Sequence, residues 1–113
     1  QTTSQKDYSK YRLEGENELY GKRGIVEAVV RKYLERNPNV TWEKFKEDFP
    51  SNLHAGGFAH VESDETRTYA DRYFTPVRLA DGTTFVYSNQ WGIKNIEPFV
   101  EHARVLGYNL EKC

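Results

Sequence analysis

Apolar residues recur with a helical period in some segments and alternate with polar residues in others, and the two patterns predict different elements. From Ile25 to Arg36 the apolar side chains are spaced as on one face of a helix, which predicts an amphipathic helix. Asn37-Pro38-Asn39 ends it, because the residue before a proline avoids the helical conformation. A second helix is predicted from Thr41, which can cap a free amide of the first turn, to Pro50, which stops it.

Two helices joined by a short connection are typical of the first half of a winged helix, a common DNA-binding arrangement. The third helix of such a unit would fall near Ser51–His54. The following Ala55-Gly56-Gly57 does not favour a long recognition helix, because glycine disfavours the helical backbone. A winged-helix-like arrangement is one form that the predicted fold can take, and this glycine-containing stretch is the main argument against it.

Strands are predicted on both sides of these helices. The segment from Tyr8 to Leu13 indicates a short strand, with Leu19-Tyr20 as its expected return. Residues 62–68 are polar and predict a loop. Residues 69–74 predict a strand, because their aromatic side chains favour a pleated, half-buried surface.

The strongest local signal is Asp81-Gly82, which separates the strand-like runs Val77–Ala80 and Thr83–Tyr87. Asp-Gly favours a two-residue hairpin turn of type I′, because that turn needs positive φ at both central positions. The resulting register places Val77 opposite Val86.

A closing helix completes the pattern, with Asn95 as its cap and Gly107 as its left-handed end. The predicted fold class is therefore α+β: two N-terminal helices, an antiparallel sheet with the hairpin at Asp81-Gly82, and a C-terminal helix. Residues 8–112 are expected to form a single domain, and residues 1–7 a disordered tail.

Composition narrows the class of protein. Sixteen basic and 17 acidic residues leave a net charge of −1, so binding to nucleic acid would need a local basic face. A single cysteine, Cys113, excludes an internal disulfide. Without an apolar run long enough to span a bilayer or a signal peptide, we expect a soluble, cytoplasmic protein that uses no cofactor. A start at Gln1 and the absence of methionine suggest an excised domain or processed chain.

Basic residues on the two helices and amides after the hairpin suggest contact with nucleic acid. Cations beside a helix N-terminus can hold phosphate, Asn and Gln can bond adenine edges, and Trp can stack on a base. The predicted contacts are Lys22, Arg23, Arg31, Lys32 and Lys44 for phosphates, and Asn89, Gln90 and Trp91 for bases or shape. Two alternatives remain open: the helix faces also carry interleaved carboxylates typical of a solvated surface, and Trp91 can be a core residue between sheet and helix.

Two histidines and two carboxylates lie close together in the sequence and form a weaker candidate for a metal site. They are His54, His60, Glu62 and Asp64. Imidazole and carboxylate groups are common metal ligands, but this spacing matches no metal-binding motif. The alternative is a set of surface residues without a ligand.

Three stretches carry a resemblance to a group of known domains. They are Tyr20-Gly21-Lys22, the segment from Thr41 to Phe49-Pro50, and Ser88–Gly92 followed by Asn95-Ile96 and a helix ending in Leu106-Gly107-Tyr108. Over residues 8–112 the chain resembles small accessory domains found beside nucleases and ATPases in bacterial restriction and defence proteins. This resemblance implies a DNA-associated binding module without a catalytic centre.

The sequence thus favours a non-catalytic module that binds or targets nucleic acid, with duplex DNA as the expected partner. It also leaves room for a neighbouring catalytic domain or a homodimer partner, and it excludes a membrane. Two alternatives remain: a protein-interaction module, indicated by the aromatic content and by the edge that a small sheet exposes, and a small metal-dependent hydrolase or nuclease.

Overall fold

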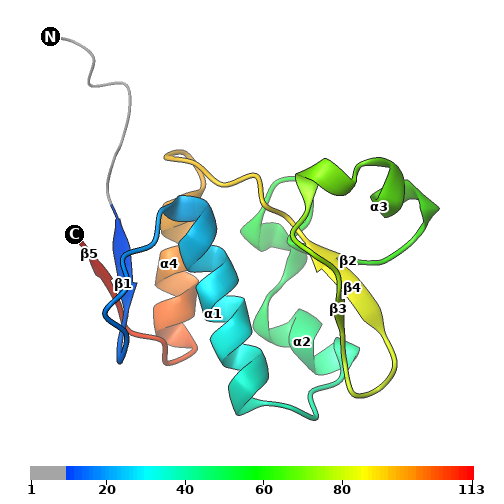
Figure 1. Cartoon of the computed structure of the whole chain (residues 1–113), viewed down its shortest axis with the longest axis horizontal. Coiled ribbons are helices and arrows are strands. Elements are labelled where there is room, and N and C mark those ends of the chain that lie inside the picture. The colour runs from blue at the N-terminus through cyan, green and yellow to red at the C-terminus, as the bar shows by residue number, and fades with distance from the viewer. Residues whose placement is uncertain (1–9) are drawn as a thin grey trace, which may run out of the picture. The chain divides into compact units, whose positions relative to one another are not determined.

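A computed structural model describes residues 10–113, which form helices and short strands (Figure 1). The α-helices are α1 (Lys22–Arg36), α2 (Trp42–Asp48), α3 (Asp64–Thr68) and α4 (Ile96–Val105). The strands are β1 (Tyr11–Leu13), β2 (Ala59–Val61), β3 (Val77–Arg78), β4 (Thr84–Tyr87) and β5 (Leu110–Lys112), and two 3₁₀ turns are η2 (Ser51–Leu53) and η3 (Ala70–Arg72). The predicted α+β class is confirmed, with two small antiparallel sheets.

The described chain divides into two compact units. The terminal unit holds the described residues through Val30 together with Trp91–Cys113, and the central unit holds Arg31–Gln90. The boundary between them falls within α1. The single domain over residues 8–112 stays a prediction, and the predicted tail, residues 1–7, lies outside the described residues.

In the terminal unit, β1 pairs antiparallel with β5 at the other end of the described chain, and Leu13 lies opposite Leu110. The predicted return strand at Leu19-Tyr20 is wrong, since only Tyr20 bridges to β1. Leu19 is 51% exposed, whereas the pairing with β5 buries both Leu13 and Leu110. The two pairings do not compete, because Tyr11 bonds Tyr20 on one edge of β1 while Lys10 and Glu14 bond the β5 side on the other. Burial of Leu13 and Leu110 stabilises the longer pairing with β5.

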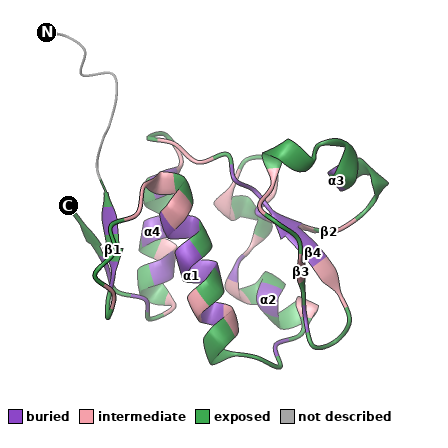
Figure 2. Cartoon of the chain, in the orientation of Figure 1, coloured by how far each residue is buried: buried purple, intermediate pink, exposed green. Residues whose placement is uncertain are grey.

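One side of helix α4 is buried (Figure 2). Its buried residues, Ile96, Phe99, Val100 and Ala103, belong to the core of the terminal unit. Its end matches the prediction, because Gly107 has φ +99° and the next amide, that of Tyr108, donates to the Ala103 carbonyl over 2.9 Å. Its start differs in detail. Asn95 precedes the helix, but its side chain accepts from the Gly92 amide instead of capping α4.

In the central unit, α2 lies over a three-stranded sheet of order β2-β4-β3, and aromatic rings fill the space between them. Phe45 of α2 is fully buried, with its ring 4.5 Å from Phe85 of β4 and 4.9 Å from Phe49. Helix α2 starts and stops as predicted. The Thr41 hydroxyl accepts from the Lys44 amide, and the helix ends before Pro50.

The hairpin at Asp81-Gly82 exists, but its predicted register is wrong by one residue. Val77 lies opposite Phe85, not Val86, and Leu79 and Thr83 close a three-residue loop. Gly82 has φ +94°, and no residue other than glycine among residues 10–113 has positive φ. A type I′ turn would need positive φ at Asp81 as well, so the chain adopts the longer loop with one left-handed glycine.

Three further predictions need correction. Within residues 62–68, which were predicted as a loop, Asp64–Thr68 form α3, because Ser63 and Thr66 build a capping box at its start. Residues 69–74 form η3 and a single bridge at Tyr73 instead of a strand. Helix α1 starts at Lys22 instead of Ile25.

The winged-helix arrangement is not confirmed, since only the short turn η2 occupies the place of a recognition helix.

Candidate binding cleft in the central unit

An open cleft of about 680 Å³ lies along β2, at one edge of the three-stranded sheet. Helix α2 forms one wall, and the segment from α3 through η3 forms the opposite wall. The side chains that give the cleft its chemistry are Trp42, Lys46, His60, Tyr69, Arg72 and Tyr73. All of them belong to the central unit.

The floor of the cleft is the unpaired edge of β2. The amides of Glu62 and Ser88 donate to the Thr84 and Phe58 carbonyls across the β2–β4 pair, both over 2.9 Å. Hydrogen-bonded residues alternate along an antiparallel strand, so the backbone groups of Ala59 and Val61 point away from β4. Both residues line the cleft, and Val61 is 48% exposed. Their N–H and C=O groups are therefore open to a partner.

Trp42 dominates the wall formed by α2. Its backbone amide donates to an Asp81 carboxylate oxygen over 2.9 Å, and its ring lies 5.4 Å from the Phe85 ring. The Lys46 ammonium lies 5.5 Å from the centre of the Trp42 ring, one helical turn further along. Hydrogen bonds from the backbone amides of Trp42 and Thr83 lower the pKa of the Asp81 carboxyl below its ordinary value.

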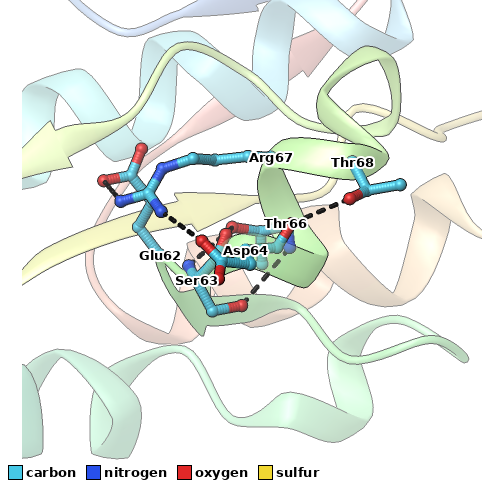
Figure 3. A network of polar contacts seen from close by, with 6 residues as sticks. All are labelled: Glu62, Ser63, Asp64, Thr66, Arg67 and Thr68. Carbon is cyan, nitrogen blue, oxygen red and sulfur yellow. Dashed lines mark hydrogen bonds and ion pairs between the residues drawn. The ribbon is translucent and has the colours of Figure 1, made fainter.

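Tyr69 and Arg72 form the corresponding pair on the opposite wall, where the guanidinium carbon lies 4.8 Å from the centre of the Tyr69 ring. A polar network at α3 supports this wall (Figure 3). The Ser63 hydroxyl accepts from the Thr66 amide over 3.3 Å, and Arg67 forms ion pairs with Asp64 and Glu62. Each wall thus presents a cation held over an aromatic ring.

His60 lies between β2 and the η3 wall, with its ring 5.9 Å edge-on from Tyr73. Its Nε2 bonds the Gly56 carbonyl over 3.1 Å, so that nitrogen carries the proton. Gly57 makes room for the ring: its φ is +94°, and a Cβ there would lie 2.7 Å from the imidazole Cε1. Gly57 is therefore required both for its backbone conformation and for the approach of His60.

The residues predicted as metal ligands have other partners. His54 accepts from the Gly56 amide through Nδ1 and donates to the Gln90 carbonyl through Nε2, which lies 2.9 Å away. Glu62 and Asp64 both form ion pairs with Arg67. Within residues 10–113, no group of three or more His, Cys, Asp or Glu side chains is arranged to hold a metal ion.

The residues predicted to contact nucleic acid are divided between the units. Lys22, Arg23 and Trp91 belong to the terminal unit, and Arg31, Lys32, Lys44, Asn89 and Gln90 belong to the central unit.

Several of these predicted contacts have partners within the protein. Lys44 pairs with Asp48 over 3.4 Å, and Lys32 lies 4.0 Å from Glu35. The buried Asn89 amide donates to two backbone carbonyls of the Asp71–Tyr73 segment, and Gln90 donates to Asn89. The half-buried Trp91 has its ring 5.4 Å from the Phe99 ring.

The sequence did not predict the cleft, although the spacing between an aromatic residue and a cation was a signal for each of its walls. Lys46 follows Trp42 by four positions on a helix, and Arg72 follows Tyr69 by three. Each spacing allows a cation to reach an aromatic ring. Nothing local marks Ala59–Val61 as the strand that brings the two pairs together, because its place depends on pairing with β4.

Within residues 10–113, no helix combines the length and the apolar character needed to cross a membrane. Comparisons of the chain with protein-family models, with curated proteins and with solved structures gave no match.

Proposed function

We propose that the chain is a protein-recognition module that binds an extended peptide segment as an added strand along β2. The observation that carries this proposal is the unpaired β2 edge at the floor of a cleft with aromatic walls. Strand addition uses backbone hydrogen bonds for affinity and side-chain contacts on alternate faces for selectivity. The cleft supplies both kinds of contact.

The backbone contacts alone are too weak to hold a peptide. Ala59 and Val61 offer two N–H and two C=O groups, and a net hydrogen bond contributes about 0.5–1.5 kcal/mol. Four such bonds contribute about 4 kcal/mol, which is at the low end of the cost of association. The rings of Trp42, Tyr69 and Tyr73 must therefore supply most of the affinity, and they are placed to contact side chains of the added strand.

The test is to select binders from a random peptide display library and to measure their affinity for two variants at the same position. Val61→Pro removes the outward N–H and leaves the β2–β4 hydrogen bonds intact, because the Val61 amide does not donate to β4. Val61→Ala shortens the side chain to a methyl group and keeps the N–H. We expect selected peptides to lose about fivefold or more in affinity for Val61→Pro and little for Val61→Ala. Equal affinity for Val61→Pro and the unchanged chain would refute strand addition.

Nucleic-acid binding is the second candidate function, and one observation favours it. The cleft combines three aromatic rings with two cations, which is the composition of sites that stack unpaired bases and contact their phosphates. Acidic residues slightly outnumber basic ones between Arg31 and Gln90, which weakens attraction to a polyanion. For this reason the peptide is our first proposal.

Fluorescence anisotropy with labelled duplex DNA and with labelled oligothymidylate, at several salt concentrations, tests the second candidate. If either is bound in the cleft, affinity should fall as salt rises. A variant with Lys46 and Arg72 changed to Ala should then bind more weakly, with a shallower salt dependence. Absence of binding at low salt would remove this candidate.

A further inference from the structure

We infer that the cleft along β2 selects acidic segments, and that Lys46 and Arg72 recognise their carboxylates from opposite walls. This inference rests on the proposed function and adds the chemistry of the partner. It starts from a difference among the cations of the central unit. Lys44 and Arg67 form ion pairs, whereas Lys46 and Arg72 form none with any carboxylate among residues 10–113.

Both unpaired cations are exposed, and each lies over an aromatic ring of the cleft. Lys46 lies over Trp42 and Arg72 lies over Tyr69, and the four side chains line the same cleft. A cation over a ring keeps its full charge and its hydrogen-bond donors, because the ring face is attracted to the charge without neutralising it. Each wall therefore offers a positioned donor for an incoming anionic group.

The charge balance of the lining residues favours an acidic partner. Glu65 is the single carboxylate among the described residues that line the cleft, against Lys46 and Arg72. The lining thus has a net positive charge within a unit that is slightly acidic as a whole.

Strand geometry explains why two cations on opposite walls can both be used. Successive side chains of an extended peptide point to opposite faces of the sheet. The Val61 side chain shares its face with Phe85 and hence with the Trp42 wall, whereas His60 shares the other face with Tyr73. A peptide with two neighbouring acidic residues would direct one carboxylate towards Lys46 and the other towards Arg72. Apolar residues beside them would contact the rings.

The test uses three fluorescein-labelled peptides that differ at one pair of neighbouring positions. The pair is Glu-Glu, Gln-Gln or Lys-Lys, and it is flanked in each peptide by alternating Val and Tyr. We expect the Glu peptide to bind on the order of tenfold more tightly than the Gln peptide, because an exposed ion pair contributes up to about fivefold for each cation. The Lys peptide should bind most weakly, and the preference should decrease as salt rises.

Reversing the charge of the two cations tests the inference more directly than changing the peptide does. The double variant Lys46→Glu/Arg72→Glu should prefer the Lys peptide over the Glu peptide. The matched control is Lys44→Glu, which makes the same change on α2 outside the cleft and should keep the preference for Glu. Lys46 and Arg72 are exposed, so the variants should fold, and circular dichroism checks this. The single variants Lys46→Glu and Arg72→Glu repeat the test with a smaller perturbation. Each should change the preference between the Glu and Lys peptides by about half as much, on a logarithmic scale, as the double variant does.

The outcomes separate this inference from the proposed function. Equal affinity for the Glu and Gln peptides, with both weakened by Val61→Pro, would overturn the acidic preference and retain strand addition. A preference for Glu that is insensitive to Val61→Pro would overturn strand addition, and this inference with it. Tighter binding of oligothymidylate than of the Glu peptide, with competition between them, would assign Lys46 and Arg72 to phosphates and overturn the peptide partner.

Discussion

Asp81 links two elements that are far apart in the sequence. One carboxylate oxygen accepts from the Thr83 amide within the hairpin loop, and the other accepts from the amide of Trp42, the first residue of α2. The amides of a helix's first turn have no partner within the helix, so this carboxylate acts as a second cap beside Thr41. Asp81 thereby fixes the backbone that carries the Trp42 ring into the wall of the cleft.

This arrangement predicts a dependence of stability on pH. The folded state lowers the pKa of Asp81, so its contribution is complete above the ordinary pKa of an aspartate and is lost as pH falls through the lowered value. We expect the unchanged chain to lose more stability than Asp81→Asn in urea unfolding compared between about pH 6 and about pH 3. Asp71→Asn is the control, because it removes an exposed carboxylate that makes no hydrogen bond among residues 10–113. This variant should lose as much stability between the two pH values as the unchanged chain does. Equal acid sensitivity of Asp81→Asn and the unchanged chain would refute this role.

At the scale of elements, the sequence predicted the helices and turns whose formation depends on residues close by in the chain. Helices α2 and α4 and the hairpin were found because caps, helical periodicity and glycine act locally. The strand β2 was missed because three residues carry no periodic signal and β4 sets their place. Helix α3 was missed because its residues are polar, although Ser63 and Thr66 mark its start.

The capping box of α3 gives a prediction at this scale. Ser63→Ala should cost about 1 kcal/mol of stability and speed amide exchange in α3, because the Thr66 amide loses its partner. Peptide binding should weaken as well, because α3 leads directly into Tyr69 and Arg72. Ser51→Ala is the control, since that hydroxyl makes no hydrogen bond within the described chain. Unchanged exchange at Thr66 in Ser63→Ala would contradict the role of the cap.

At the scale of the whole molecule, composition predicted the character of the core better than the site. The high aromatic content is used in the central unit, where the Phe45 ring lies close to those of Phe49 and Phe85, and the Phe49 ring stacks on Phe58. The candidate site could not be predicted in the same way. No local pattern distinguishes Lys46 and Trp42 from the other basic and apolar residues of α2, since the edge of β2 that joins them to the site depends on long-range pairing.

The pairing of β1 with β5 has a consequence for how this protein can vary. These strands are the first and the last of the described chain, and they belong to the same unit. The central unit therefore lies, in the sequence, between two segments of the terminal unit. If the central unit has the proposed function, changes of its sequence would alter the partner while the β1–β5 pairing stays the same. An exchanged central unit would have to continue α1, because the junction between Val30 and Arg31 lies within that helix.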